Sequence, residues 1–239
     1  MDNFAVVAHL GTPVILTRGR LTLDSILAAQ IYRETEDFNY ANANIPLLRT
    51  DGVWHGSAAL FGMGDPHYAP FGRSMKMDDL ENGCWKPLRG KYPFFVDQAR
   101  NDPGSANQWR AMFNTYAATA SDKVIWFGHG DISSVRRLMA SLMEGGGVGK
   151  KTSHGYGRIN EVNVVPVQND YSLVLPDGRP ARPVPVDVWL AMGGADIPSV
   201  ARETFMPPYF DNNLAVSCVV PPVRFLSTSE WRSFRRMAG

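Results

Sequence analysis

The feature that most constrains the fold is a glycine-rich, basic stretch, EGGGVGKKTSHGYGR, at residues 144–158. Before it, residues 123–128 (KVIWFG) form an apolar β-rich run. Residues 131–143 (DISSVRRLMASLM) then repeat apolar side chains with helical spacing behind Asp131, a good N-cap residue. After the stretch, residues 156–167 again have the pattern of a strand. The sequence therefore predicts strand, helix, glycine-rich turn and strand in direct succession.

The chain before this stretch supplies the other elements of one domain. Residues 4–10 (FAVVAHL) are typical of a strand. Residues 21–34 (LTLDSILAAQIYRE) carry an apolar stripe at helical spacing behind Thr22, the expected N-cap. Residues 53–61 (VWHGSAALF) predict a second strand with a weaker pattern. The order is βαββαβ, so we predict an α+β fold of the ferredoxin-like, RRM-like kind.

Two segments lie outside this core. Residues 62–122 are rich in proline, glycine and aromatic side chains, and we interpret them as one large insertion containing a helix near residues 106–120. Two further strands are expected in the proline-rich remainder, at residues 184–190 and 214–220. The predicted boundaries are 1–170 for the domain with its insertion and 171–239 for a small C-terminal β-rich extension.

Composition narrows the function classes. The 24 lysine and arginine residues nearly balance 23 aspartate and glutamate residues, so any affinity for nucleic acid depends on where the cations are placed. Cys84 and Cys218 lack the paired spacing of a structural zinc site, and neither a metal nor another cofactor is expected. No secretion signal or membrane-length apolar run is visible, which favours a cytoplasmic protein without membrane contact.

The glycine-rich stretch fails the two nucleotide-binding motifs that it most resembles. Aligning Lys150 with the P-loop lysine puts Glu144 where the first glycine belongs and Lys151 where the magnesium-binding hydroxyl belongs. A P-loop also precedes its helix, whereas this stretch follows one. A dinucleotide motif that begins at Gly147 needs glycine at Thr152. Both nucleotide interpretations are therefore rejected.

We interpret the stretch instead as a flexible ribbon that lets an RNA backbone approach main-chain N–H groups. Lysine and arginine side chains flank it, hydroxyl and imidazole groups add hydrogen-bonding partners, and Tyr156 offers a ring for base stacking. The alternative is a helix C-cap followed by a mobile loop, for which Gly145 alone is enough. Six glycines, three cations and an aromatic ring exceed what a cap requires.

The chain resembles the RAMP superfamily of CRISPR proteins over about residues 4–167. The resemblance rests on the LDSILA helix after the first strand, the βαββαβ order, and the loop GVGKKTSHGYGRI before the last strand. Within the superfamily the chain is most similar to the Cas-five-type subunits of type IV systems (Csf three). Chain length, the segment inserted after WHGSAALF and the loop sequence support that similarity.

The resemblance implies a non-catalytic, RNA-binding subunit of a type IV effector complex, a ribonucleoprotein of antiviral defence. Such a subunit is implied to grip the 5′ handle of the guide RNA (crRNA) and to cap a filament of backbone RAMP subunits. A large or small effector subunit is a further implied partner, and target DNA is another candidate. The implied RNA contacts are Arg18, Arg20, Gly147, Gly149, Lys150, Lys151, Thr152, Ser153, His154, Tyr156 and Arg158. The insertion is implied to act as a thumb, with candidate contacts Arg73, Lys76, Lys86, Arg89 and Lys91.

Two other functions stay open at this point. One is a metal-independent endoribonuclease that processes crRNA, with His154 next to Lys150 or Tyr156 as the candidate site. The predicted first helix contains no histidine, although processing members of the superfamily commonly have one there. The other is a protein-interaction module. The arginines of the C-terminal WRSFRRMAG suit either RNA phosphates or an acidic protein neighbour.

Overall fold

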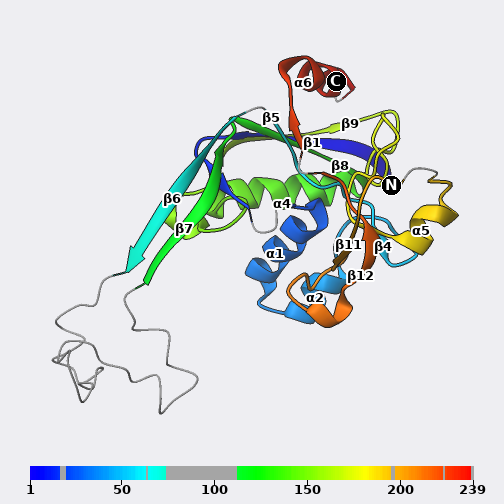
Figure 1. Ribbon diagram of the computed structural model, residues 1–239, viewed down its shortest axis with the longest axis horizontal. Helices are drawn as coiled ribbons and strands as arrows, with labels where there is room; N and C mark the ends of the chain where they lie inside the picture. The colour runs from blue at the N-terminus through cyan, green and yellow to red at the C-terminus, as the bar shows by residue number, and fades with distance from the viewer. Residues whose placement is uncertain (17–19, 63, 74–111, 195–196, 223, 238–239) are drawn as a thin grey trace, which may run out of the picture. The chain divides into compact units, whose positions relative to one another are not determined.

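The computed structural model has a mixed α+β architecture (Figure 1). It describes residues 1–16, 20–62, 64–73, 112–194, 197–222 and 224–237. The chain forms two compact units, one made of Met1–Pro66 together with Ala118–Gly239 and the other of His67–Ala117. The domain boundary expected at residue 170 stays a prediction.

The largest sheet has the strand order β13-β5-β8-β1-β9. Strand β1 pairs antiparallel with both β8 and β9, β5 is antiparallel to β8, and β13 is parallel to β5. The strands span Asp2–Leu10 (β1), Leu60–Gly62 (β5), Lys123–Gly130 (β8), Ile159–Pro166 (β9) and Arg224–Leu226 (β13). The predicted strands at 4–10, 123–128 and 156–167 are confirmed within a few residues. The strand expected at 53–61 is broken into β4 and β5.

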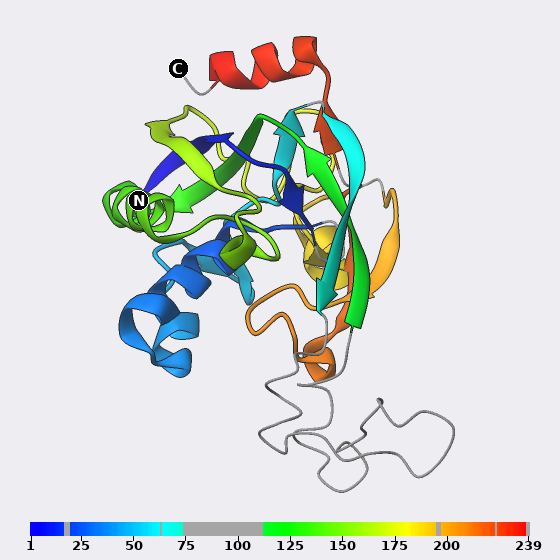
Figure 2. The ribbon, with the colours of Figure 1, turned by 90° about the vertical axis from the view of Figure 1, so that its left-hand side faces the viewer.

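Both faces of this sheet are buried because its central strands are apolar on both sides. On β1, Phe4 and Val6 belong to one hydrophobic cluster, while Ala5 and Val7 belong to another. Helices α1 (Leu23–Thr35) and α4 (Ile132–Gly145) cover the first face, and α6 (Thr228–Met237) covers the second (Figures 1 and 2). A strand that is buried on both faces has a nearly continuous run of apolar residues, and KVIWFG is such a run.

The two main helices begin at the residues that the sequence indicates. The Asp131 carboxylate accepts a hydrogen bond from the Ser133 N–H at 3.0 Å, which confirms it as the N-cap of α4. Thr22 is the N-cap residue of α1, but its side chain makes no cap hydrogen bond. Its hydroxyl instead donates to the Tyr209 hydroxyl at 3.0 Å. Helix α1 ends at Glu36, which has the left-handed φ of 56°.

Two sequence predictions are wrong in the remaining elements. The helix expected near residues 106–120 is the strand β7 (Met112–Ala120) over the residues that the structure describes, and β7 is the middle strand of the sheet β2-β7-β6. Its alanines suggested a helix, but strand pairing decides its conformation. The strand expected at 184–190 is only Val184–Pro185 (β10), followed by the helix Val186–Ala191 (α5). Pro185 occupies the N-cap position of that helix, and Asp187 lies in its first turn, where a negative charge is favoured.

The smaller elements complete the chain. Strand β12 (Val216–Val219) confirms the strand predicted at 214–220 and pairs with β10 and with β11 (Val200–Glu203). The others are β2 (Val14–Ile15), α2 (Phe38–Ala43), β3 (Arg49–Thr50), β4 (Val53–Trp54), β6 (Asp65–Arg73) and the 3-10 turns η2 (Thr152–His154) and η3 (Asn212–Leu214). Among the described residues, no helix is long and apolar enough to cross a membrane.

A fully buried ion pair joins α1 to the C-terminal half of the chain. Arg182 and Asp24 are both completely buried, and Arg182 Nη1 lies 3.1 Å from Asp24 Oδ1. Arg182 also donates to the Gly56 carbonyl at 3.1 Å and to the Tyr209 hydroxyl at 2.8 Å. Burial raises the pKa of Tyr209, so its phenol stays protonated and donates to the Asp24 carboxylate.

Candidate nucleic-acid interface

The glycine-rich stretch is a tightly closed turn between α4 and β9. Gly147 and Arg158 face each other in an antiparallel bridge, and the Val148 N–H donates to the Gly157 carbonyl at 2.9 Å. Within the turn, the short η2 is flanked by Lys151 and Gly155, both with left-handed backbone. The stretch is thus a folded hairpin with defined internal hydrogen bonds.

The glycines allow close approach of two backbone segments. Gly157 has a φ of +66°, and a Cβ added there would lie 1.8 Å from the Val148 carbonyl oxygen. Gly149 has a φ of +87°, and its Cβ would lie 2.5 Å from the Ile15 carbonyl oxygen. Any residue other than glycine at these positions is strained and also clashes. The expected flexible ribbon is therefore corrected, since backbone packing explains these glycines.

Thr12 fastens this turn to the segment that follows β1. Its hydroxyl donates to the Gly155 carbonyl at 2.7 Å and accepts from the Arg158 N–H at 2.9 Å. The Gly157 N–H donates to the Pro13 carbonyl at 2.8 Å, beside the hydroxyl contacts. Sequence reasoning missed Thr12, which lies two residues after the strand predicted at 4–10. No pattern within the sequence indicates that it contacts a turn 143 residues away.

The hydrogen bonds within the turn change how it can contact RNA. Backbone N–H groups that were expected to face phosphates are already used, since Val148, Lys150 and Gly157 donate to carbonyls of the protein. Any contact with phosphates would then fall to the side chains. Those exposed to solvent are Lys150, Ser153, His154 and Arg158, and those half-buried are Lys151, Thr152 and Tyr156. A rigid turn bearing three cations, hydroxyls and one tyrosine ring can bind a polyanion with aromatic surface.

His154 has the surroundings of a surface residue. It is exposed, and its Nδ1 lies 3.2 Å from the Ser153 hydroxyl. That hydroxyl is a neutral partner. Its exposed position supports a role for His154 in contacting a ligand.

The remaining predicted RNA contacts are placed as follows. Arg20 forms an ion pair with Glu203, donates from Nε to the Pro221 carbonyl at 3.1 Å, and has a side chain only 18% exposed. These contacts join the N-terminal and C-terminal parts of the larger unit, so Arg20 has a structural role. Arg73 is the last residue of β6. The other predicted contacts lie outside the described residues: Arg18, Lys76, Lys86, Arg89 and Lys91.

Helix α6 combines a packed apolar side with exposed cations. Trp231 and Phe234 are buried in the hydrophobic cluster on the second face of the main sheet. Arg232, Arg235 and Arg236 are exposed. The apolar residues explain why the helix docks there, and the arginines remain available for either of the two partners that the sequence left open.

A second group of polar side chains surrounds His55, between β4 and β5. Its Nδ1 lies 3.0 Å from the Asp170 carboxylate, and its Nε2 lies 3.1 Å from the Thr50 hydroxyl. Because a carboxylate only accepts, Nδ1 carries a proton in the contact with Asp170. Burial opposes ionisation of Asp170, but hydrogen bonds from His55 and Ser172 outweigh it and lower the pKa of this carboxyl. His55 is a largely covered, hydrogen-bonded side chain.

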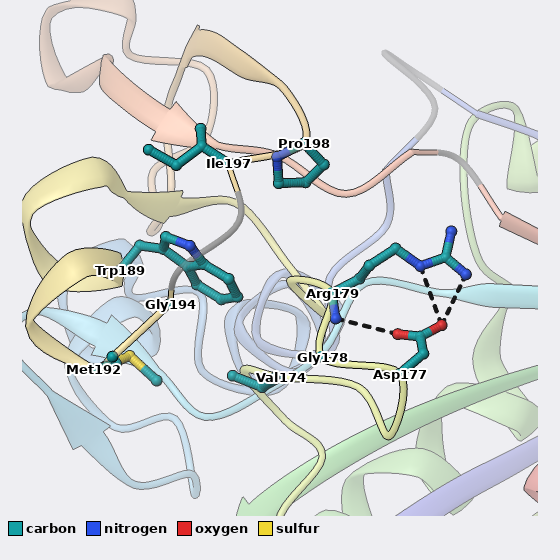
Figure 3. Close-up of a pocket in the computed structure, with 10 residues that line it drawn as sticks. Val174, Asp177, Gly178, Arg179, Trp189, Met192, Gly194, Ile197 and Pro198 are labelled. Atoms are coloured by element: carbon teal, nitrogen blue, oxygen red, sulfur yellow. Dashed lines mark hydrogen bonds and ion pairs between the residues drawn. The ribbon is translucent and has the colours of Figure 1, made fainter.

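An open cavity of about 670 Å³ lies beside α5 (Figure 3). Trp189, Met192 and Ile197 provide its apolar wall, and the other side holds an ion pair in which Arg179 Nη2 lies 2.8 Å from Asp177 Oδ2. None of the predicted RNA contacts that the structure describes lines it. It is therefore separate from the candidate interface. Over the described part of the chain, no group of three or more histidine, cysteine, aspartate or glutamate residues is arranged to hold a metal ion.

Comparison with known proteins does not assign a family. No protein-family model matches the sequence, and a search of curated proteins returns no significant match.

Proposed function

We propose that this chain is a non-catalytic guide-RNA-binding subunit of a type IV CRISPR effector complex, of the Cas-five type within the RAMP superfamily. In this proposal it grips the 5′ handle of the crRNA and caps the filament of backbone RAMP subunits in the cytoplasm. A large or small effector subunit is a second proposed neighbour, and target DNA is a further proposed contact.

The order of the main sheet supports a ferredoxin-like core. Taken in chain order, β1, β5, β8 and β9 are the four strands of a βαββαβ unit, and they lie side by side as β5-β8-β1-β9. The two helices of that unit, α1 and α4, cover the same face. This is the arrangement that the ferredoxin-like proposal requires.

The observation that carries the RNA-binding proposal is the position and construction of the glycine-rich turn. It connects the second helix of the unit to its last strand, and Thr12 fastens it beside the end of the first strand. The turn presents Lys150, Lys151 and Arg158 on a backbone that is already ordered. Binding therefore needs little further ordering of the main chain, which favours affinity for a defined RNA segment.

The test is binding of purified protein to labelled repeat RNA, measured across a series of salt concentrations. Replacing Lys150 and Lys151 together with alanine removes two phosphate contacts, so the slope of log affinity against log salt should flatten by about 1.4 for single-stranded RNA. The matched control is Arg137→Ala with Arg179→Ala, because these cations are paired with Glu34 and Asp177 and their removal changes the net charge equally.

Each outcome of this experiment decides between the candidate functions. Weakened binding and a flatter slope in the lysine variant alone support the proposal. Equal effects in both double variants indicate a non-specific charge effect, and unchanged guide binding removes the turn from the interface. Discrete cleavage of the repeat RNA by the wild-type protein, lost in His154→Ala, establishes the endoribonuclease instead.

A further inference from the structure

Three aromatic side chains form an exposed patch at the end of α1, on α2 and on the loop before η3, and a fourth, Tyr40, is exposed two residues after Phe38. Tyr32 is 47% exposed, Phe38 42%, Tyr40 51% and Phe210 76%. Three of the rings are in contact, with centroids 6.4 Å apart for Tyr32 and Phe38 and 5.7 Å apart for Phe38 and Phe210. Single exposed apolar side chains are ordinary, but a contiguous aromatic patch marks an interaction site.

The fold builds this patch from segments far apart in sequence. The left-handed residue Glu36 ends α1, and the Asp37 carboxylate then caps α2 by accepting from the Tyr40 N–H at 2.9 Å. This sharp connection brings Phe38 against Tyr32. Phe210 comes from the loop before η3, which lies beside α2 in Figure 1. Because caps and turns fix the backbone, the aromatic rings are presented by ordered segments.

A cavity adjoins the patch. Phe210 lines a space of about 490 Å³ together with Thr204 at the end of β11, Ser25 on α1, and Pro183. In binding hot spots, an anchor side chain of the partner protein fills a pocket and contacts the aromatic rings around it. An exposed ring beside a cavity of this size has that arrangement. The aromatic patch and this cavity therefore form one continuous docking surface.

The charges around the surface select its partner. Residues 34–48 and 203–223, which supply all of the aromatic patch except Tyr32, contain no lysine or arginine. Arg20 also lines the cavity, but it is paired with Glu203. The two segments contain five acidic residues, of which Glu34 and Glu203 are paired with arginines and Glu36, Asp37 and Asp211 form an acidic rim. An acidic rim repels nucleic acid and attracts a cationic protein. Arginine also stacks favourably on aromatic faces.

We propose that the aromatic patch and its adjoining cavity bind a partner protein through a basic segment. The arginine or lysine side chains of that segment lie over the rings and against Glu36, Asp37 and Asp211, and one apolar or aromatic anchor enters the cavity beside Phe210. The chain then has two surfaces of opposite preference: the glycine-rich turn for a polyanion and this surface for a cationic protein.

The test is selection of random peptides displayed on phage against the full-length protein, followed by affinity measurement of the enriched peptides by fluorescence anisotropy. Enriched peptides should combine arginine or lysine with an apolar or aromatic residue. Phe210→Ala should weaken their binding at least about tenfold, as expected for a hot-spot residue. Because Phe210 is 76% exposed, this variant should fold normally, which its melting temperature checks.

Charge variants separate this surface from the glycine-rich turn. Glu36→Lys should weaken the selected peptides severalfold, whereas Glu161→Lys, an equal charge reversal at an exposed position of β9, should leave them unchanged. The Lys150→Ala, Lys151→Ala protein should bind them normally. Enrichment of acidic or uncharged peptides, failure to enrich any, or binding that ignores Phe210→Ala overturns the proposal. If RNA displaces the peptides from this surface, the surface binds RNA instead. If the protein self-associates and Phe210→Ala abolishes the self-association, the surface binds a second copy of the chain.

Discussion

Asp24 and Arg182 form an ion pair with no exposure to solvent, 3.1 Å between Oδ1 and Nη1, and they are separated by 158 residues in the chain. Asp24 lies in the first turn of α1, where the helix dipole favours a carboxylate. Arg182 reaches it from the segment before β10 and also donates to the Gly56 carbonyl. The pair therefore links the first helix, the approach to β5 and the C-terminal half of the larger unit.

Removing one member of this pair should be strongly destabilising. Arg182→Met leaves the Asp24 carboxylate buried without its counter-charge, and we expect a loss of about 3–5 kcal/mol in the free energy of unfolding. Urea denaturation measures it. The double variant Asp24→Leu, Arg182→Met should be more stable than Arg182→Met alone, because no unpaired charge is left inside. Destabilisations that simply add would show that the two side chains do not interact.

The two glycines that flank Tyr156 should respond differently to alanine. Both have left-handed backbone, with φ of +85° at Gly155 and +66° at Gly157. An added Cβ meets nothing within 4 Å at Gly155 but lies 1.8 Å from the Val148 carbonyl oxygen at Gly157. Gly155→Ala should therefore cost only the left-handed strain of about 1–2 kcal/mol, and Gly157→Ala clearly more. Urea denaturation of both variants tests this, and equal losses would contradict the close approach seen in the turn.

The sequence predicts correctly those helices and strands whose local residue pattern favours the same conformation as their packing and strand pairing in the folded protein. The run KVIWFG and the Asp131 cap both specify their elements locally, and β8 and α4 follow them. Residues 112–120 contain four alanines or methionines in nine and suggested a helix, yet β7 is a strand because its neighbours β2 and β6 complete its hydrogen bonds. Tertiary pairing overrides local propensity there.

For the candidate interface, the sequence locates the turn but not how it is built. Side-chain chemistry is visible in the residue types, so Lys150, Lys151 and Arg158 could be named in advance. The role of Gly157 depends on a carbonyl nine residues away, and that of Thr12 on a contact across the sheet. The burial of Arg182 likewise has no local signature, because an arginine among prolines is typical of a surface loop.

The hydrogen bonds around Asp170 predict a defined pH dependence of stability. Burial opposes ionisation, but the contact with His55 and the Ser172 N–H, which donates at 2.8 Å, lower the pKa of Asp170 below its ordinary value of 3.8. A carboxyl with a lowered folded-state pKa contributes stability that is fully present above its unfolded value. That contribution is lost as pH falls from about 3.8 through the lower folded-state pKa.

Asp170→Asn should therefore melt at a lower temperature than the wild-type protein at neutral pH. Below pH 3.8 the two melting temperatures should converge, because the wild-type carboxyl then becomes protonated and loses its advantage. Thermal denaturation of both proteins from pH 7 to the lowest pH at which they remain folded measures the difference. Asp211→Asn serves as a control for charge removal, since the Asp211 carboxylate caps η3 by accepting from the Asn213 N–H at 2.9 Å. A gap between wild type and Asp170→Asn that persists unchanged below pH 3.8 would show that the ionised carboxylate is not the stabilising species.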